Sequence, residues 1–169
     1  MILQSDAGAP PIVRGAIAPD FALRGLGAAP TEPGALMSLD SLRGRVVLVN
    51  FWATWCEPCE REMPAMERLY EAMPRDTFEL VAVAIDEKEA DVQAFQDRYT
   101  LSFPILLDLD QSVYQSYQTM GVPESLLLDR DGRIVERYVG PREWDAPEYV
   151  ERIRAQVRGD SAKVSPAGG

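Results

Sequence analysis

The sequence predicts an α/β fold in which a central mixed β-sheet is flanked by helices. Two apolar runs, residues 46–51 and 78–85, have the pattern of strands that are covered on both faces. An amphipathic segment lies between them, and a helix crossing over the sheet is the usual connection between parallel strands. The 169 residues, 46% of them apolar, are enough to fill one core, so we expect a single folded domain.

The other elements follow in chain order. Short apolar segments at 21–23 and 36–39 flank a loop rich in Gly, Pro and Ala, which predicts a β-hairpin at the edge of the domain. Between the two long strands, apolar residues recur every three or four positions over 58–72, and Pro74 ends this predicted helix. After the second long strand we expect a helix at 90–99, a short strand at 105–107, a short helix at 111–117, an antiparallel hairpin with strands at 126–128 and 134–139, and a closing helix at 145–157.

The two ends of the chain are rich in Ala, Gly, Pro and Ser and show no apolar periodicity. We therefore expect a flexible N-terminal segment over 1–18, one monomeric domain over 19–157 and a flexible tail over 158–169. Residues 1–6 lack the basic start and the long apolar stretch of a secretory signal. A leader or membrane anchor can be removed from a chain, so this is no evidence for the cytoplasm.

Composition excludes several classes of function. The formal net charge of −10 argues against nucleic acid and anionic membrane surfaces as partners. The chain has no histidine, which excludes Ser/His/Asp and Cys/His catalytic arrangements and imidazole metal sites. Its longest apolar stretch, residues 46–53, is far shorter than the roughly 20 residues that cross a bilayer, so we expect no membrane span. We also expect no metal and no cofactor.

The two cysteines, Cys56 and Cys59, form a Cys-x-x-Cys motif between the first long strand and the helix after it. This placement in a β-α-β unit is typical of a redox-active dithiol. The helix N-terminus favours the thiolate of Cys56 and lowers its pKa, whereas Cys59 lies one turn further in and is shielded. Cys56 would attack a disulfide of a partner, and Cys59 would then resolve the mixed disulfide.

Other roles for the cysteine pair are weaker. A zinc site needs four ligands, and no further cysteine or histidine exists. A structural disulfide across so short a loop gains little entropy, and inert thiols are unusual at a helix N-terminus. Pro58 suits the first turn of the helix, and Glu57 would raise the pKa of Cys56 through like-charge repulsion.

Residues 46–59, VVLVNFWATWCEPC, followed by Glu62 and Pro64, resemble the TlpA/ResA-like thioredoxins. Residues 18–21 resemble the first segment of that family's domain, residues 121–125 its cis-proline loop and residues 129–134 its closing hairpin. The resemblance covers most of the predicted domain. It implies a thioredoxin fold with an N-terminal β-hairpin extension.

The resemblance also implies the function. Members are protein thiol-disulfide oxidoreductases in the periplasm or on the outer face of the cytoplasmic membrane, often tethered by an N-terminal anchor. They reduce disulfides in protein substrates such as apo-cytochrome c or copper-site proteins. Because that compartment is oxidising, a membrane thiol donor would have to keep the two cysteines reduced.

The resemblance assigns further site residues. Pro123 maps onto the cis-proline, which would lie against the Cys56 sulfur and leave the Val122 backbone free to pair with an extended substrate segment. Trp55 would offer a flat apolar contact surface beside the nucleophile, with Glu57 and Pro58 next to it in the substrate-binding surface. Trp52 is expected in the core.

The proton acceptor for Cys59 is less clear from the sequence. Asn50 stands where cytosolic thioredoxin has a buried aspartate that assists proton transfer to the second cysteine. Glu87, just after the second long strand, falls where ResA-like members place an acidic residue. We therefore predict Glu87 as the acceptor if partial burial raises its pKa; the alternative is an exposed loop glutamate.

Two other functions stay open. A peroxiredoxin shares the segment at 18–21, but its catalytic loop has Thr three residues before the cysteine, where this chain has Ala53. A copper or apo-protein chaperone would use Cys56 and Cys59 as soft ligands, although little else is present to complete a Cu(I) site. Peroxide consumption would identify the first function. Tight Cu(I) binding without disulfide exchange would identify the second.

Overall fold

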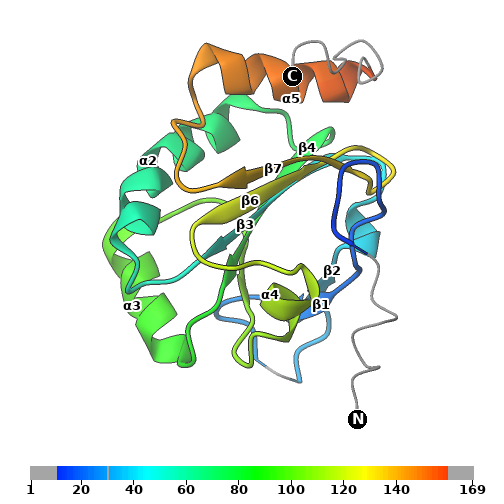
Figure 1. Ribbon diagram of the computed structural model, residues 1–169. Helices are drawn as coiled ribbons and strands as arrows, with labels where there is room; N and C mark the ends of the chain where they lie inside the picture. Colours follow the sequence, from blue (N-terminus) through cyan, green and yellow to red (C-terminus); the bar gives the residue numbers. More distant parts are fainter. Residues whose placement is uncertain (1–10, 30, 160–169) are drawn as a thin grey trace.

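The computed structural model describes residues 11–29 and 31–159 of the chain. In chain order the elements are β1 Ala22–Arg24, β2 Leu36–Ser38, the 3-10 helix η1 Asp40–Leu42, β3 Val46–Trp52, α2 Glu57–Ala72, β4 Phe78–Ala84, α3 Glu89–Tyr99, β5 Ile105–Leu107, α4 Ser112–Ser116, β6 Glu124–Leu128, β7 Ile134–Val139 and α5 Pro147–Arg158. Figure 1 shows a central sheet surrounded by helices, with the β1–β2 hairpin near one edge. The predicted thioredoxin fold with an N-terminal hairpin is confirmed.

The central sheet has the strand order β5-β4-β3-β6-β7. The two long strands β3 and β4 are parallel, and every one of their seven residues is buried, as their continuous apolar character predicted. β4 and β5 are also parallel, whereas β6 and β7 run antiparallel to their neighbours. The carboxyl end of β3 is therefore in the middle of the sheet, where the cysteine loop begins.

Helices cover both faces of the sheet. Successive side chains of a strand point to opposite faces, so neighbouring residues of β3 contact different helices. Trp52 contacts Phe95 of α3, with ring centroids 4.9 Å apart, and an ion pair links α3 to α2. Phe51 points the other way and contacts Tyr114 of α4 at 6.1 Å. Hence α2 and α3, adjacent in Figure 1, cover one face, and α4 lies on the other.

The N-terminal part of the described chain contacts the sheet. Gly15 N–H donates to the carbonyl of Ile134 at 2.8 Å, Ile17 bridges to Arg133, and Ala18 is buried. Composition alone predicts that residues 11–18 are flexible. It does not reveal their hydrogen bonds to β7 and to the turn before it. Residues 1–10 and 160–169 lie outside the described residues, so the domain boundaries stay a prediction.

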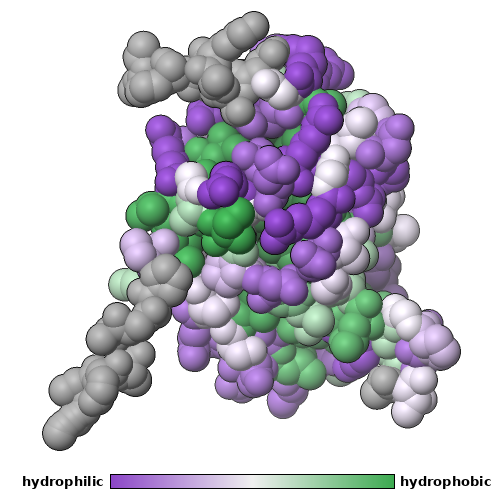
Figure 2. Space-filling view, turned by 90° about the vertical axis from the view of Figure 1, so that its right-hand side faces the viewer, coloured by the Kyte–Doolittle hydropathy of each residue, from purple (hydrophilic) through white to green (hydrophobic). Residues whose placement is uncertain are grey.

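The face turned to the viewer in Figure 2 carries mostly hydrophilic side chains with separate apolar patches between them, as is usual for a folded domain. Among the described residues, no helix has both the length and the apolar character needed to cross a membrane.

Candidate functional site

The two cysteines lie at the N-terminus of α2, directly after β3. Cys56 is the N-cap residue, and its sulfur accepts a hydrogen bond from the Cys59 N–H at 3.2 Å. The two residues form a disulfide with their Cα atoms 5.3 Å apart. Cys56 keeps 6% of its surface exposed, whereas Cys59 has none. This asymmetry suits a two-step exchange, because only the more accessible sulfur can meet a partner.

The loop that presents the cysteines is fixed by a buried carboxylate that the sequence analysis did not identify. Asp86, which follows β4 and is 2% exposed, accepts hydrogen bonds from the Thr54 N–H at 3.0 Å and the Thr54 hydroxyl at 2.5 Å. Ile85 N–H donates to the carbonyl of Trp52 at 2.9 Å and continues the strand pairing into the loop. These bonds hold the backbone that leads to Trp55 and Cys56.

A second buried carboxylate, Glu62, lies one turn after Cys59 on α2 and is 3% exposed. Its Oε1 accepts from Asn50 Nδ2 at 3.3 Å, and its Oε2 accepts from the Arg142 N–H at 2.9 Å and from Trp144 Nε1 at 2.7 Å. Asn50 Nδ2 also donates to Ser125 Oγ at 2.9 Å. Burial raises the pKa of Glu62 to about 7, although each of the three hydrogen bonds that Glu62 accepts lowers it.

Glu62 shares a helix face with Cys59. Residues three or four apart on a helix are neighbours, and Cys59, Met63 and Met66 belong to the same buried stripe as Glu62. The sequence contained this signal: an acidic residue within the apolar stripe of an amphipathic helix. The apolar positions alone predict the helix but give Glu62 no role, and the family resemblance includes Glu62 without assigning it to the site.

Glu87, the predicted proton acceptor, is exposed. It lines a shallow depression of about 220 Å³ together with Trp55, Lys88, Asp91 and Gln111. Glu87 therefore lacks the partial burial on which its predicted role depended, because the chain leaves the sheet at Asp86 and turns outward. Glu62, by contrast, is buried, and its pKa is raised to about 7, which suits a proton acceptor at neutral pH.

The predicted substrate-binding residues are at the same end of the sheet as the cysteines. Pairing of Phe51 with Glu124 places Pro123 at the end of β3. The Val122–Pro123 peptide bond is cis, and the backbone of Val122 makes no hydrogen bond to other described residues. Trp55 is 68% exposed, as a contact surface requires.

The remaining predicted contact residues flank the nucleophile. Glu57 is exposed and pairs with Arg61 at 2.8 Å, one helical turn away, and Pro58 is half-buried. Two further exposed apolar side chains lie beside the cis-proline loop: Met120, 93% exposed, precedes it, and Val139, 69% exposed, pairs with Glu124. Sequence reasoning did not name these two.

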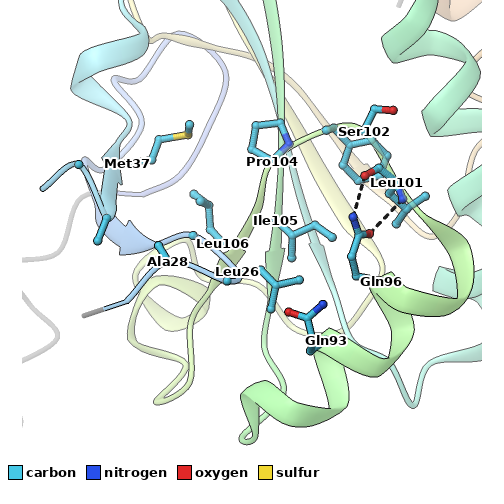
Figure 3. A pocket seen from close by; sticks show the side chains of 15 residues that line it. Leu26, Ala28, Met37, Gln93, Gln96, Leu101, Ser102, Pro104, Ile105 and Leu106 are labelled. Carbon is cyan, nitrogen blue, oxygen red and sulfur yellow. Dashed lines mark hydrogen bonds between the residues drawn. The ribbon is translucent and has the colours of Figure 1, made fainter. Parts of the chain in front are cut away.

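A larger cavity, about 500 Å³, lies between the β1–β2 hairpin, β5 and α3 (Figure 3). Its lining includes Leu26, Met37, Pro104 and Ile105, and Gln96 closes one side by exchanging two hydrogen bonds with the backbone of Leu101. The lining contains neither cysteine nor any charged side chain. The redox chemistry therefore belongs to the cysteine loop and not to this cavity.

Among the described residues, no group of three or more Cys, His, Asp or Glu side chains is arranged to hold a metal ion. The groups described around the cysteines are a disulfide-forming cysteine pair, a buried carboxyl group and an exposed apolar surface. In its reduced form the cysteine pair can transfer two electrons and two protons to a disulfide of a partner.

Comparison with known proteins agrees with this chemistry. The model of the AhpC/TSA family matches residues 14–137. The thiol-disulfide oxidoreductase ResA of Bacillus thuringiensis (strain Al Hakam) is 35% identical over 133 residues, which cover 79% of this chain and 71% of ResA. The thioredoxin-like protein YneN of Bacillus subtilis (strain 168) is 42% identical over 132 residues, covering 76% and 73% of the two chains.

A similar solved structure is that of a protein assigned as the thiol:disulfide interchange protein DsbE from Chlorobium tepidum. The TM-score is 0.73 at 30% sequence identity, and the match covers 89% of this chain and 99% of that one. The similarity therefore extends over most of the chain.

Proposed function

This chain belongs to the AhpC/TSA family and is a thiol-disulfide oxidoreductase of the ResA/DsbE type, and on that premise we propose that it reduces disulfides of protein substrates. The observation that carries the proposal is the Cys56–Cys59 pair at the start of α2, with a buried carboxyl group one turn behind it. Cys56 is the attacking thiolate and Cys59 the resolving thiol.

The exchange proceeds in two steps. The Cys56 thiolate attacks one sulfur of the substrate disulfide, forms a mixed disulfide and releases the other substrate sulfur as a thiolate. Cys59 then loses its proton and attacks the Cys56 sulfur, which breaks the mixed disulfide and releases the second substrate sulfur. The substrate gains two electrons, and the enzyme ends in the disulfide form.

Glu62 is the proton acceptor for Cys59 in the second step, in place of Glu87. A carboxyl group whose pKa is about 7 is half-ionised at neutral pH and can both take up and return a proton. Its position three residues after Cys59 on the same buried helix face supports this role.

The substrate binds as an extended segment across the end of the sheet. The free backbone of Val122, next to Pro123, can pair with such a segment in the manner of an added strand. Exposed Trp55, next to Cys56, and exposed Met120, just before the cis-proline loop, offer apolar contacts to the substrate, and Glu57 and Pro58 lie beside the nucleophile.

We further propose that the reaction takes place outside the cytoplasm, in the periplasm or on the outer face of the cytoplasmic membrane, on apo-cytochrome c or copper-site proteins. The resemblance to TlpA/ResA-like thioredoxins supports this placement. Because that compartment is oxidising, a membrane thiol donor supplies the electrons that keep Cys56 and Cys59 reduced.

The midpoint potential of the Cys56/Cys59 couple tests the direction of the reaction. The protein is equilibrated with defined thiol-disulfide buffers, and free thiols are then trapped. We expect a value below about −220 mV, which is that of a reductase. A value above about −150 mV is that of an oxidant and would contradict the proposal. In parallel, Cys59→Ser should accumulate the mixed disulfide with a disulfide-containing apo-cytochrome c peptide, and Cys56→Ser should not.

A further inference from the structure

The loop between β7 and α5 contacts α2 at Glu62. Two donors of this loop, the Arg142 N–H and the Trp144 indole N–H, bind the same carboxylate oxygen, Glu62 Oε2, at 2.9 and 2.7 Å. The shorter of the two bonds comes from a side chain that is 1% exposed. A carboxylate on the cysteine helix is thus held by residues about 80 positions away in the sequence.

The Trp144 ring is fixed from two sides, so its N–H group has one direction. Tyr138 of β7 meets it edge to face at 5.0 Å, and Tyr149 of α5 lies 5.2 Å away. The next residue, Asp145, accepts a hydrogen bond from Arg68 of α2 at 2.7 Å and ties the loop to the same helix. The indole therefore points at Glu62 without needing to reorganise.

We propose that Trp144 is a positioning residue for proton transfer from Cys59: its indole N–H binds the Glu62 carboxylate and stabilises the ionised, proton-accepting form. This inference rests on the proposed role of Glu62 as proton acceptor. A hydrogen bond to a charged acceptor is among the stronger contacts in a protein interior, and here both groups are out of water.

The surroundings of Glu62 leave few other groups that control its charge. Cys59 lies on its own helix, and Arg142 acts on it both through the backbone N–H and through its positive charge. From the sheet, the neutral side chain of Asn50 in β3 donates to Glu62 and also to the hydroxyl of Ser125 in β6, which is neutral too. Among these groups, the Trp144 indole makes the shortest bond to the carboxylate.

The chain contains a matched control for an indole N–H. Trp52 is also fully buried, but its Nε1 has no hydrogen-bond partner among the described residues. Replacement of either tryptophan by Phe removes a similar volume from the core, but only Trp144→Phe removes a hydrogen bond to Glu62. A comparison of the two variants therefore separates loss of the bond from loss of packing.

The first experiment uses the unmodified protein in its disulfide form, in which the cysteines do not titrate. The three tryptophans give three indole N–H resonances in a ¹⁵N–¹H correlation spectrum. We expect the Trp144 resonance to shift with a midpoint near pH 7 that equals the midpoint of the Glu62 side-chain carboxyl, measured by ¹³C. The Trp52 resonance should show no such midpoint. A Trp144 resonance that stays constant while Glu62 titrates would overturn the proposal.

The second experiment follows the resolving step in reduced protein mixed with 5,5′-dithiobis(2-nitrobenzoate). The release of the second thionitrobenzoate reports the attack of Cys59 on Cys56. Loss of the indole bond should raise the pKa of Glu62 by about 1. For Trp144→Phe we therefore expect a rate about fivefold below wild type at pH 7 that recovers almost fully by pH 9. Trp52→Phe should show the same pH profile as wild type.

The outcomes separate the two proposals. If Glu62→Gln loses the pH-dependent acceleration but Trp144→Phe keeps the wild-type midpoint, Glu62 remains the acceptor and the role of Trp144 is refuted. If Glu62→Gln resolves as fast as wild type at every pH, the acceptor role itself is wrong and the inference falls with it. A defect in Trp144→Phe that is equal at all pH values shows a purely structural role and also refutes the inference.

Discussion

Two glutamates near the cysteines differ in how far their side chains are buried. Glu62 is 3% exposed, carries three hydrogen bonds and has a pKa raised to about 7, whereas Glu87 is exposed at the rim of a shallow depression beside Trp55. In the sequence Glu87 is the more suggestive, because it directly follows a strand that ends near the active site. The comparison teaches that burial by distant segments raises the pKa of a carboxyl group, and that a position shortly after a strand does not by itself bury one.

The strongest test of this contrast is to remove each carboxylate separately. Glu62→Gln should slow the resolving step at pH 7 by about 100-fold, because positioned acid-base catalysis commonly contributes that much. Glu87→Gln, which makes the same chemical change on the surface, should leave the rate unchanged. Stopped-flow measurement of the second thiol release gives both values. Equal defects in the two variants would remove the distinction between the two sites.

The same contrast predicts a difference in stability that depends on pH. A carboxyl group with a pKa of about 7 in the folded state and 4.5 when unfolded favours folding below pH 4.5, and this contribution is lost as the pH rises through 7. Relative to Glu62→Gln, the wild type should therefore lose about 3 kcal/mol of unfolding free energy between pH 4 and pH 8.

Urea unfolding of the disulfide form at the two pH values measures this difference. Glu87→Gln, which makes the same chemical change at an exposed position, serves as the control. If the difference in unfolding free energy between wild type and Glu62→Gln is the same at both pH values, burial does not raise the pKa of Glu62, and the prediction is wrong.

The sequence predicted the framework of the fold more fully than the polar contacts within it. The strands β3 and β4 are buried on both faces, so their apolar runs nearly match their observed bounds. β6 begins at Glu124, two residues before the predicted strand, because Glu124 and Ser125 are buried polar residues and Glu124 pairs with Arg137 across the sheet. A polar residue with a tertiary partner cannot be told from a loop residue by periodicity alone.

The candidate site divides in the same way. Cys56, Cys59 and Pro123 belong to short local motifs, and the structure places all three at one end of the sheet. The contacts of Glu62 with Asn50 and Trp144 span 12 and 82 positions of sequence, and no local pattern encodes them. The packing of α2 against β3 brings Asn50 to Glu62, and the packing of the loop after β7 against α2 brings Trp144 to it.

The smallest expected effect is that of replacing the exposed Trp55. Trp55 is 68% exposed, and a tryptophan at the centre of an interface often contributes more than its neighbours. Trp55→Ala should lower kcat/KM for a protein disulfide about fivefold, which corresponds to about 1 kcal/mol, but should leave the rate with glutathione disulfide unchanged. Leu36→Ala is the matched control, because Leu36 is 62% exposed but lies on the N-terminal hairpin.

The pH profile of the resolving step in Trp55→Ala tests whether the exposed surface at Trp55 is independent of the buried Glu62. If Trp55 acts only by contact with the substrate, the variant keeps the wild-type pH profile of the resolving step, since Trp55 makes no hydrogen bond to Glu62 among the described residues. A shifted profile would show that the exposed surface and the buried carboxyl group are coupled. Substrate contact and proton transfer would then have to be treated as one site, and the contrast between Glu62 and Glu87 would no longer describe two independent regions.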